Sequence, residues 1–238
     1  MTTLLFREDA YQKEADGTVL AHTGDGGIVL DQSLFYPTGG GQAGDSGHLQ
    51  WAGAPLPITG TVKGPDGAII LRPEEGAMLP PPGTAVVQQI DWDRRYLMMR
   101  LHTALHLMSV VVPFPVTGGQ ISPEKGRLDF DMPDAPGDKA AIEEEINALI
   151  AADHPVAEFW IDADELRATP ALVKTVSVMP PMDAGMVRLV RIGPAQDHVD
   201  LQACGGTHVA RTKEIGAVRL GKVEKKSRTN RRFNLFLA

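Results

Sequence analysis

The chain has 238 residues, enough for one large domain or two small ones, and its 43% hydrophobic content is ordinary for a globular protein. No apolar run approaches the roughly 18 residues of a membrane helix, and acidic N-terminal residues stand where a signal peptide would be apolar. A single cysteine excludes an internal disulfide, and a net charge of −7 argues against non-specific nucleic-acid binding. We therefore expect a cytoplasmic protein with no membrane partner and no obligate protein partner.

The first part of the chain consists of short apolar runs between glycine- and proline-rich turns. Runs at residues 27–30, 56–58 and 68–71 alternate with turn signals at 24–27 and 64–67, and prolines 80–82 form a stiff connector. Short strands at this spacing are typical of a small β-barrel or a β-sandwich. We predict a glycine-rich β-barrel domain over residues 1–88, followed by an α+β domain over residues 89–238.

A glycine-rich segment, FYPTGGGQAGDSG at residues 35–47, lies inside the predicted barrel. Three consecutive glycines permit close approach of a backbone to another molecule. The segment is not a phosphate-binding P-loop, because no Gly-Lys-Ser/Thr follows it. Two interpretations remain open: a tight turn of the barrel, or a loop lying against a ligand with Thr38 and Gln42 as polar contacts.

The second part begins with a predicted strand at 86–91 and a helix at 94–111, for which Asp91 or Asp93 is the candidate cap. Leu97, Leu101, Leu105 and Met108 recur at helical spacing and predict a core stripe, and prolines 113 and 115 end the helix. His102 and His106 lie beside this stripe, four residues apart. One face of a helix therefore carries both imidazoles within reach of a single ion.

The remaining elements alternate between helices and strands. We predict helices at 138–152 and 163–168, with Glu143, Glu144 and Glu145 of the first as solvent-exposed surface. Predicted strands lie at 127–131, 156–161, 186–192, 198–202, 215–223 and 233–237. This order indicates an α+β domain with a mainly antiparallel sheet packed by helices.

A second candidate metal-binding segment is Ala-Cys-Gly-Gly-Thr-His at 203–208. Its two glycines allow a turn that brings the Cys204 thiolate and the His208 imidazole to one point. With His102 and His106, the donors are three nitrogens and one sulfur, a set that suits tetrahedral Zn²⁺. Histidines on a helix are often only partly buried surface, but this chain places its one cysteine and three of its seven histidines in these two segments. We predict one Zn²⁺ per chain.

Polar residues elsewhere are candidates for orienting the imidazoles through their second ring nitrogens. Asp45, Asp200 and Gln202 are the residues considered, and ordinary turn or strand polarity is the alternative for each.

A basic strip near the end of the chain contrasts with the acidic total. Six basic residues face one acidic residue in KVEKKSRTNRR, which can contact phosphate or form a solvated tail or hairpin. The candidate phosphate-binding residues are Lys222, Lys225, Lys226, Arg228, Arg231 and Arg232.

Four motifs together resemble the free-standing alanyl-tRNA editing proteins (the AlaX family), in the longer form with an N-terminal glycine-rich β domain. These proteins are similar to the editing domain of alanyl-tRNA synthetase. The motifs are FYPTGGGQAGDSG at 35–47, DWDRR…RLHTALHL at 91–107, GGQIS…RLDFD at 118–131 and DLQACGGTHVARTKEIG at 200–216.

The resemblance implies a zinc-dependent, ATP-independent ester hydrolase that removes the amino acid from mischarged tRNA(Ala), chiefly Ser-tRNA(Ala), with Gly-tRNA(Ala) as a second substrate. It implies that His102, His106, Cys204 and His208 bind zinc and that Thr38 and Gln120 act in catalysis. The implied substrate-binding residues are Thr38, Gly39, Gly40, Gln42, Gln120 and Gly206. Many relatives have threonine where this chain has Leu105, a departure that bears on substrate preference.

Two alternatives belong to other classes. A non-catalytic tRNA- or RNA-binding protein with a structural zinc is compatible with four protein ligands. A metallopeptidase is disfavoured, because Thr103 stands where the HExxH motif requires glutamate.

Overall fold

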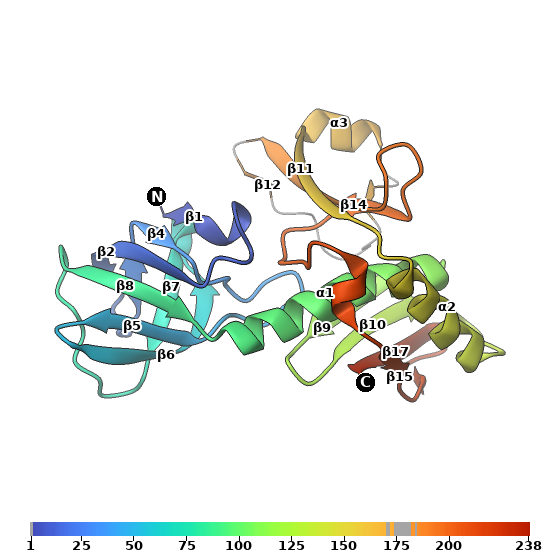
Figure 1. The fold of residues 1–238 in the computed structure, drawn as a ribbon, viewed down its shortest axis with the longest axis horizontal. Coiled ribbons are helices and arrows are strands. Elements are labelled where there is room, and N and C mark those ends of the chain that lie inside the picture. Colours follow the sequence, from blue (N-terminus) through green and yellow to red (C-terminus); the bar gives the residue numbers. More distant parts are fainter. Residues whose placement is uncertain (1, 170–171, 174–181, 184) are drawn as a thin grey trace. The chain divides into compact units, whose positions relative to one another are not determined.

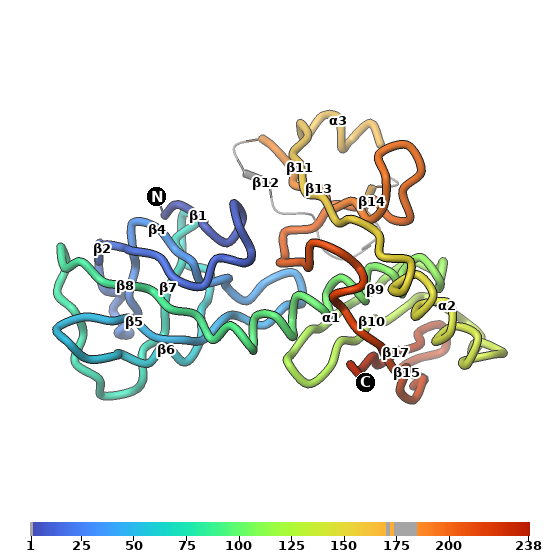
Figure 2. The backbone as a smooth tube through the Cα atoms, viewed as in Figure 1, coloured from blue at the N-terminus to red at the C-terminus, as the bar shows by residue number. Residues whose placement is uncertain are grey.

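A computed structural model describes residues 2–169, 172–173, 182–183 and 185–238 of the chain (Figure 1). The chain forms two compact units, Met1–Tyr96 and Leu97–Ala238, each with its own hydrophobic core. Figure 2 follows the backbone through the first unit in blue to green and through the second in green to red. Among the described residues, no helix combines the length and the apolar character needed to span a membrane.

The first unit is a closed barrel of six antiparallel strands, which confirms the predicted small β-barrel. Around the barrel the strands follow the order β2-β3-β7-β6-β5-β8. They are β2 (Glu14–His22), β3 (Ile28–Leu30), β5 (Gly47–Trp51), β6 (Ala54–Lys63), β7 (Ile69–Pro73) and β8 (Ala85–Ile90). Beside the barrel, β1 (Thr3–Leu4) pairs in parallel with β4 (Gln32–Ser33).

The barrel is filled by alternate side chains of its strands. Ile28 and Leu30 of β3, Leu49 of β5 and Leu71 of β7 are each at most 1% exposed. Burying such a side chain stabilises the fold by about 1.5–3 kcal/mol relative to leaving it in water. The short apolar runs that predicted strands are therefore the runs that form this core.

The second unit contains most of helix α1 (Trp92–Val111), which begins in the first unit. The helix starts two residues before the predicted Arg94, and the Asp91 carboxylate caps it by accepting a hydrogen bond from the Arg94 amide at 3.1 Å. Two further helices, α2 (Lys139–Ala151) and α3 (Ala163–Ala168), lie where they were predicted. Asp138 caps α2 through the Ala141 amide.

Two antiparallel sheets complete the second unit and confirm the predicted α+β class. One sheet has the order β15-β17-β10-β9, with β16 paired to β17, and in the other β13 pairs with β11, β12 and β14. The strands of the first sheet are β9 (Val116–Ile121), β10 (Gly126–Asp131), β15 (Val218–Leu220), β16 (Glu224–Lys225) and β17 (Asn230–Leu237). Those of the second are β11 (Val156–Asp162), β12 (Met182–Asp183), β13 (Met186–Ile192) and β14 (Asp200–Ala203).

Helix α1 packs closely on β10. A methyl group at Gly126 would lie 3.1 Å from the Leu105 side chain, so Leu105 occupies the space directly over this glycine. Leu101, Leu105 and Met108 are at most 3% exposed. Three residues of the predicted stripe, including Leu105, are therefore core, whereas the fourth, Leu97, is half-buried.

Two local predictions were wrong. The predicted strand at 215–223 forms only over β15, and its first residue, Ile215, belongs to a short 3₁₀ turn, Thr212–Ile215. Glu143 is not simple solvent-exposed surface: its carboxylate accepts a hydrogen bond from the Leu220 amide at 2.7 Å and ties α2 to β15. Glu144 and Glu145 are exposed, as predicted.

Candidate metal centre

The second unit brings together the four side chains that the sequence singled out as metal ligands. His102 and His106 come from consecutive turns of α1, and Cys204 and His208 come from the loop that follows β14. One donor atom from each of these residues lies within 4.8 Å of the other three. The three histidines are at most 6% exposed, whereas Cys204 is half-buried.

The distances in the cluster fit a small tetrahedral ion. The Cys204 Sγ lies 3.4 Å from His102 Nε2 and 3.3 Å from His208 Nε2. Zn–N bonds of about 2.0–2.1 Å and Zn–S bonds of about 2.3 Å in a tetrahedron imply donor–donor separations of about 3.3–3.6 Å. Two donor pairs therefore already have about the separation that such an ion requires, and the four donor atoms all lie within 4.8 Å of one another.

The His106 ring is oriented by the Asp200 carboxylate. His106 Nδ1 lies 2.9 Å from Asp200 Oδ2, and the same oxygen accepts a hydrogen bond from Gln202 Nε2 at 2.7 Å. With Nδ1 donating its proton to Asp200, the Nε2 atom of His106 is the one available to an ion. Asp200 therefore has the orienting contact considered for it, whereas Gln202 contacts Asp200 and not an imidazole.

Thr103 orients the His208 ring, a role that sequence reasoning missed. Its buried hydroxyl lies 3.1 Å from His208 Nδ1 and donates to the Met99 carbonyl at 3.1 Å. Since a hydroxyl has only one proton to donate, His208 Nδ1 must donate to the Thr103 oxygen. That tautomer leaves Nε2 of His208 unprotonated and facing Cys204. The sequence signal that could have revealed this role is the position of Thr103 directly after His102 in the HTALH motif.

The electrostatics of the cluster favour a thiolate. Burial alone would raise the pKa of the Cys204 thiol, but the adjacent His102 and His208 rings lower this pKa well below its usual value. Burial would lower the pKa of His106, whereas hydrogen bonding to Asp200 and Cys204 raises it to about 9. Burial, followed by the neighbouring His102, lowers the pKa of His208. A thiolate beside imidazoles is the form in which cysteine binds metals.

The glycine-rich segment forms a tight turn in the first unit. Gly39 and Gln42 exchange two backbone hydrogen bonds of 3.0 Å, and the two residues between them, Gly40 and Gly41, have φ values of 58° and 83°. A two-residue turn with positive φ at both positions favours glycine. The structure therefore shows the tight turn that was one of the two interpretations of this segment.

The polar residues of this segment differ in what they present to solvent. Thr38 is exposed, and its hydroxyl donates to the Thr61 carbonyl at 3.2 Å and accepts from the Gly44 amide at 2.9 Å. Gln42 is fully buried, so its amide is not presented to a ligand at the surface.

Asp45, the third residue considered for orienting an imidazole, has a different role. Its buried carboxylate accepts hydrogen bonds from Arg95 Nε at 2.9 and 3.1 Å and from the Tyr36 amide at 2.6 Å. The prediction for Asp45 was wrong, because a fully buried arginine and not an imidazole is its partner.

Gln120 does not lie on the face of the sheet that packs against α1. It pairs in register with Arg127, whose Nε donates to the Gln120 side-chain oxygen at 3.0 Å. Neighbouring residues on a strand point to opposite faces, and Leu105 covers the adjacent Gly126. The Gln120 side chain therefore points away from the helix that carries His102 and His106, and its contact with substrate stays a prediction that this geometry does not support.

The basic strip forms a hairpin of β16 and β17, and its residues fall into two groups. Arg231 is buried and donates to the Ser227 and Pro133 carbonyls, and Arg232 binds Asp129 at 2.7 and 2.8 Å. The exposed members are Lys222, Lys225, Lys226 and Arg228. These exposed residues are the ones that can contact a phosphate group.

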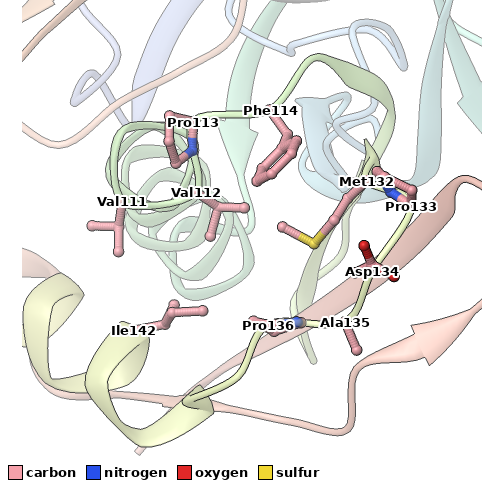
Figure 3. A pocket seen from close by; sticks show the side chains of 10 residues that line it. All are labelled: Val111, Val112, Pro113, Phe114, Met132, Pro133, Asp134, Ala135, Pro136 and Ile142. Atoms are coloured by element: carbon pink, nitrogen blue, oxygen red, sulfur yellow. The ribbon is translucent and has the colours of Figure 1, made fainter.

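A separate apolar cavity of about 300 Å³ lies where α1 ends (Figure 3). Figure 3 shows Val112, Phe114 and Met132 pointing into it, with Ile142 of α2 on the opposite side. None of the four clustered metal-ligand candidates lines this cavity. The cavity and the cluster are therefore different features of the second unit.

Comparisons with known families place the chain among tRNA synthetase-related proteins. Residues 187–234 match the model described as "Threonyl and Alanyl tRNA synthetase second additional domain", and residues 6–94 match "tRNA synthetases class II (A)". The two matched ranges include the barrel, Cys204 and His208, and they leave His102 and His106 outside.

Full-length relatives define the family more closely. The chain is 36% identical to "Alanyl-tRNA editing protein AlaX-M" of Saccharolobus solfataricus, over 98% of this chain and 97% of the relative. It is 34% identical to the protein of the same name from Methanosarcina acetivorans, again over 98% and 97%. This chain belongs to the alanyl-tRNA editing protein family. It is also 35% identical to the alanine–tRNA ligase of Pyrobaculum arsenaticum, of which it spans 25%.

Proposed function

We propose that this protein is a cytoplasmic trans-editing hydrolase that deacylates mischarged tRNA(Ala), with one Zn²⁺ per chain. Ser-tRNA(Ala) is the main proposed substrate and Gly-tRNA(Ala) a second one. The observation that carries the proposal is the convergence of His102, His106, Cys204 and His208 in a chain that matches alanyl-tRNA editing proteins over nearly its whole length.

Such an activity answers a physical problem of alanine selection. A pocket built for alanine gains only about 1–3 kcal/mol from the methyl group that glycine lacks, and it excludes the additional hydroxyl of serine poorly. A second site that hydrolyses the wrong ester supplies the missing discrimination. In the proposed reaction, the oxygen of a water molecule bonds to the ester carbonyl carbon, the bond to the terminal ribose breaks, and the ribose oxygen takes a proton.

The residues of the cluster fit a zinc ion in type and in the spacing of Cys204 to His102 and His208. Thiolate and imidazole donors favour Zn²⁺ over the oxygen-preferring Mg²⁺ and Ca²⁺. Asp200 and Thr103 hold the proton of their imidazole partners on Nδ1 and leave Nε2 for the ion. A bound zinc would supply Lewis acidity and a positive charge to hold and polarise the ester.

Thr38 is the proposed contact for the seryl hydroxyl. Its hydroxyl uses its single proton on Thr61 and one lone pair on Gly44, which leaves one lone pair that can accept a hydrogen bond. Serine can fill that position and alanine cannot, a difference of about 1–3 kcal/mol. The Gly39–Gly40 backbone beside Thr38 permits close approach of the substrate, and Gly206 beside Cys204 has the same proposed role. The buried side chain of Gln42 does not support a direct contact with the substrate.

The exposed part of the basic strip is the proposed contact for the tRNA backbone. Lys222, Lys225, Lys226 and Arg228 concentrate positive charge on one hairpin of a protein whose net charge is negative. Charge of this kind binds phosphate without reading sequence. Arg231 and Arg232 support the hairpin through their internal contacts.

A second candidate function is non-catalytic tRNA binding with a structural zinc. The closed set of four protein donors favours it, since catalytic zinc sites commonly keep one coordination position open. The two functions differ in whether the ester is broken.

The experiment that tests the proposal is deacylation of matched Ser-, Gly- and Ala-tRNA(Ala), with and without a chelator. Release of serine that spares alanine and stops on chelation supports zinc-dependent editing. Binding of all three tRNAs without release of any amino acid would leave only the structural-zinc alternative.

A further inference from the structure

Arg188 of β13 holds the turn that carries the cysteine of the cluster. It is a buried arginine, with 2% of its surface exposed. Its Nη1 donates to the carbonyls of Cys204 and Gly206, at 2.9 Å each, and its own backbone carbonyl accepts from the Cys204 amide at 3.1 Å. One residue therefore fixes both backbone polar groups of Cys204.

We propose that Arg188 is a positioning residue that sets the Cys204–Gly206 turn so that the cysteine sulfur meets the imidazole nitrogens. The proposal rests on the proposed metal site, and it assigns to Arg188 the preorganisation of that site. Because its guanidinium is buried behind the turn, Arg188 acts through Cys204 and not by touching substrate.

The turn needs such a support because it contains Gly205 and Gly206. Glycine loses more backbone freedom on folding than any other residue, so a Cys-Gly-Gly turn without external contacts populates many conformations. The Arg188 guanidinium is planar and donates in fixed directions, and it binds the peptide plane before Gly205 and the peptide plane after Gly206. The Gly206 amide between them points at Cys204 Sγ at 3.5 Å.

Arg188 is itself held by the neighbouring strand. Glu158 of β11 forms an ion pair with its guanidinium, which offsets the cost of burying a positive charge. β13 lies between β11 and β14, so Arg188 reaches Glu158 on one side and the turn after β14 on the other. These contacts form one chain from Glu158 through Arg188 to Cys204.

Arg191 offers a matched control on the same strand. It lies three residues further along β13 and therefore on the other face of the sheet, with its guanidinium 5.7 Å from the centre of the Phe159 ring. Replacing either arginine by lysine keeps the charge and removes the planar fork. Only Arg188→Lys removes the clamp from the cysteine turn.

The test uses Co²⁺ as a spectroscopic substitute for Zn²⁺ in the full-length wild type, Arg188→Lys and Arg191→Lys. We expect Arg188→Lys to bind Co²⁺ about 10–100-fold more weakly and to show a weaker thiolate-to-cobalt charge-transfer band. Its metal-free thermal unfolding should stay cooperative, and Arg191→Lys should match the wild type in affinity and spectrum. Equal affinity and spectrum in Arg188→Lys, or an equal loss in Arg191→Lys, would overturn the proposal.

A second variant decides the matter if Arg188→Lys does not fold. Glu158→Gln removes the charge that holds Arg188, at a side chain that is 30% exposed, and we expect a smaller loss of Co²⁺ affinity in the same direction. An unchanged affinity and spectrum in that case refute the role of Arg188. A wild type that binds neither Co²⁺ nor Zn²⁺ refutes the metal site itself, which is a different result.

Discussion

Replacing Thr103 by valine tests whether the cluster is built for an ion. Valine has nearly the same shape and is β-branched like threonine, so the substitution removes the hydroxyl and little else. That hydroxyl accepts from His208 Nδ1 at 3.1 Å and from the Val209 amide at 3.3 Å. In the variant both groups stay buried and lose this acceptor.

The magnitude follows from these contacts. A buried donor left without its acceptor costs about 1–3 kcal/mol, so with two donors affected we expect the free energy of unfolding of the metal-free protein to fall by about 2–6 kcal/mol. The His208 ring is also free to move its proton to Nε2, the atom that faces Cys204. Loss of a partner that orients a metal-binding histidine typically lowers affinity 10–100-fold, equivalent to about 1.4–2.7 kcal/mol.

The assay is a Zn²⁺ titration in competition with a chromophoric chelator, paired with urea unfolding of the metal-free proteins. Thr61→Val is the matched control, because Thr61 is also a buried threonine whose hydroxyl donates to a backbone carbonyl, that of Asp45 at 2.9 Å. It should lose stability and keep its Zn²⁺ affinity. Wild-type Zn²⁺ affinity in Thr103→Val would refute the orienting role even if its stability falls.

Three further predictions concern the proposed function. Cys204→Ala should abolish both metal retention and deacylation, and elemental analysis that still finds one metal ion per chain would remove Cys204 from the ligand set. Thr38→Val should reduce discrimination of serine from alanine about 5- to 150-fold, whereas Thr38→Ser should preserve it; equal relative deacylation rates in wild type and Thr38→Val would exclude this contact. Neutralising the exposed basic strip should weaken tRNA binding. The slope of log affinity against log salt concentration should become shallower by about 3–4 for four lost phosphate contacts. An unchanged slope would show that the strip does not contact tRNA phosphates. That variant replaces by glutamine the residues Lys222, Lys225, Lys226 and Arg228.

The histidine–cysteine cluster could be predicted from local sequence because each half of it is set by local geometry. His102 and His106 share a face because a helix turns every 3.6 residues, and the glycines between Cys204 and His208 permit a turn. The convergence of the two halves could be inferred because the chain has a single cysteine and few histidines, which leaves little choice of partners. The barrel was predictable for a similar reason, since alternating apolar runs and turn residues are local signals.

The supporting contacts could not be predicted, because they depend on which strands become neighbours. Arg188 meets the Cys204 turn only because β13 pairs with β14, and no spacing in the sequence shows that pairing. Asp45 was assigned to an imidazole since nothing in the sequence shows that Arg95 is buried beside it. The orientation of Gln120 follows from its register with Arg127, which is likewise a tertiary property.

The separation of the two halves of the cluster along the chain has a consequence for the lifetime of the protein. An ion bound to both His102 and Cys204 would act as a cross-link that closes a loop of 102 residues. By the chain-entropy argument used for covalent cross-links, closing a loop of that length is worth about 4.7 kcal/mol, a large share of the stability of an ordinary domain. When the ion is scarce, more of the protein would therefore unfold and be degraded by proteases. The amount of folded protein would fall, in addition to the loss of activity at sites that lack the ion.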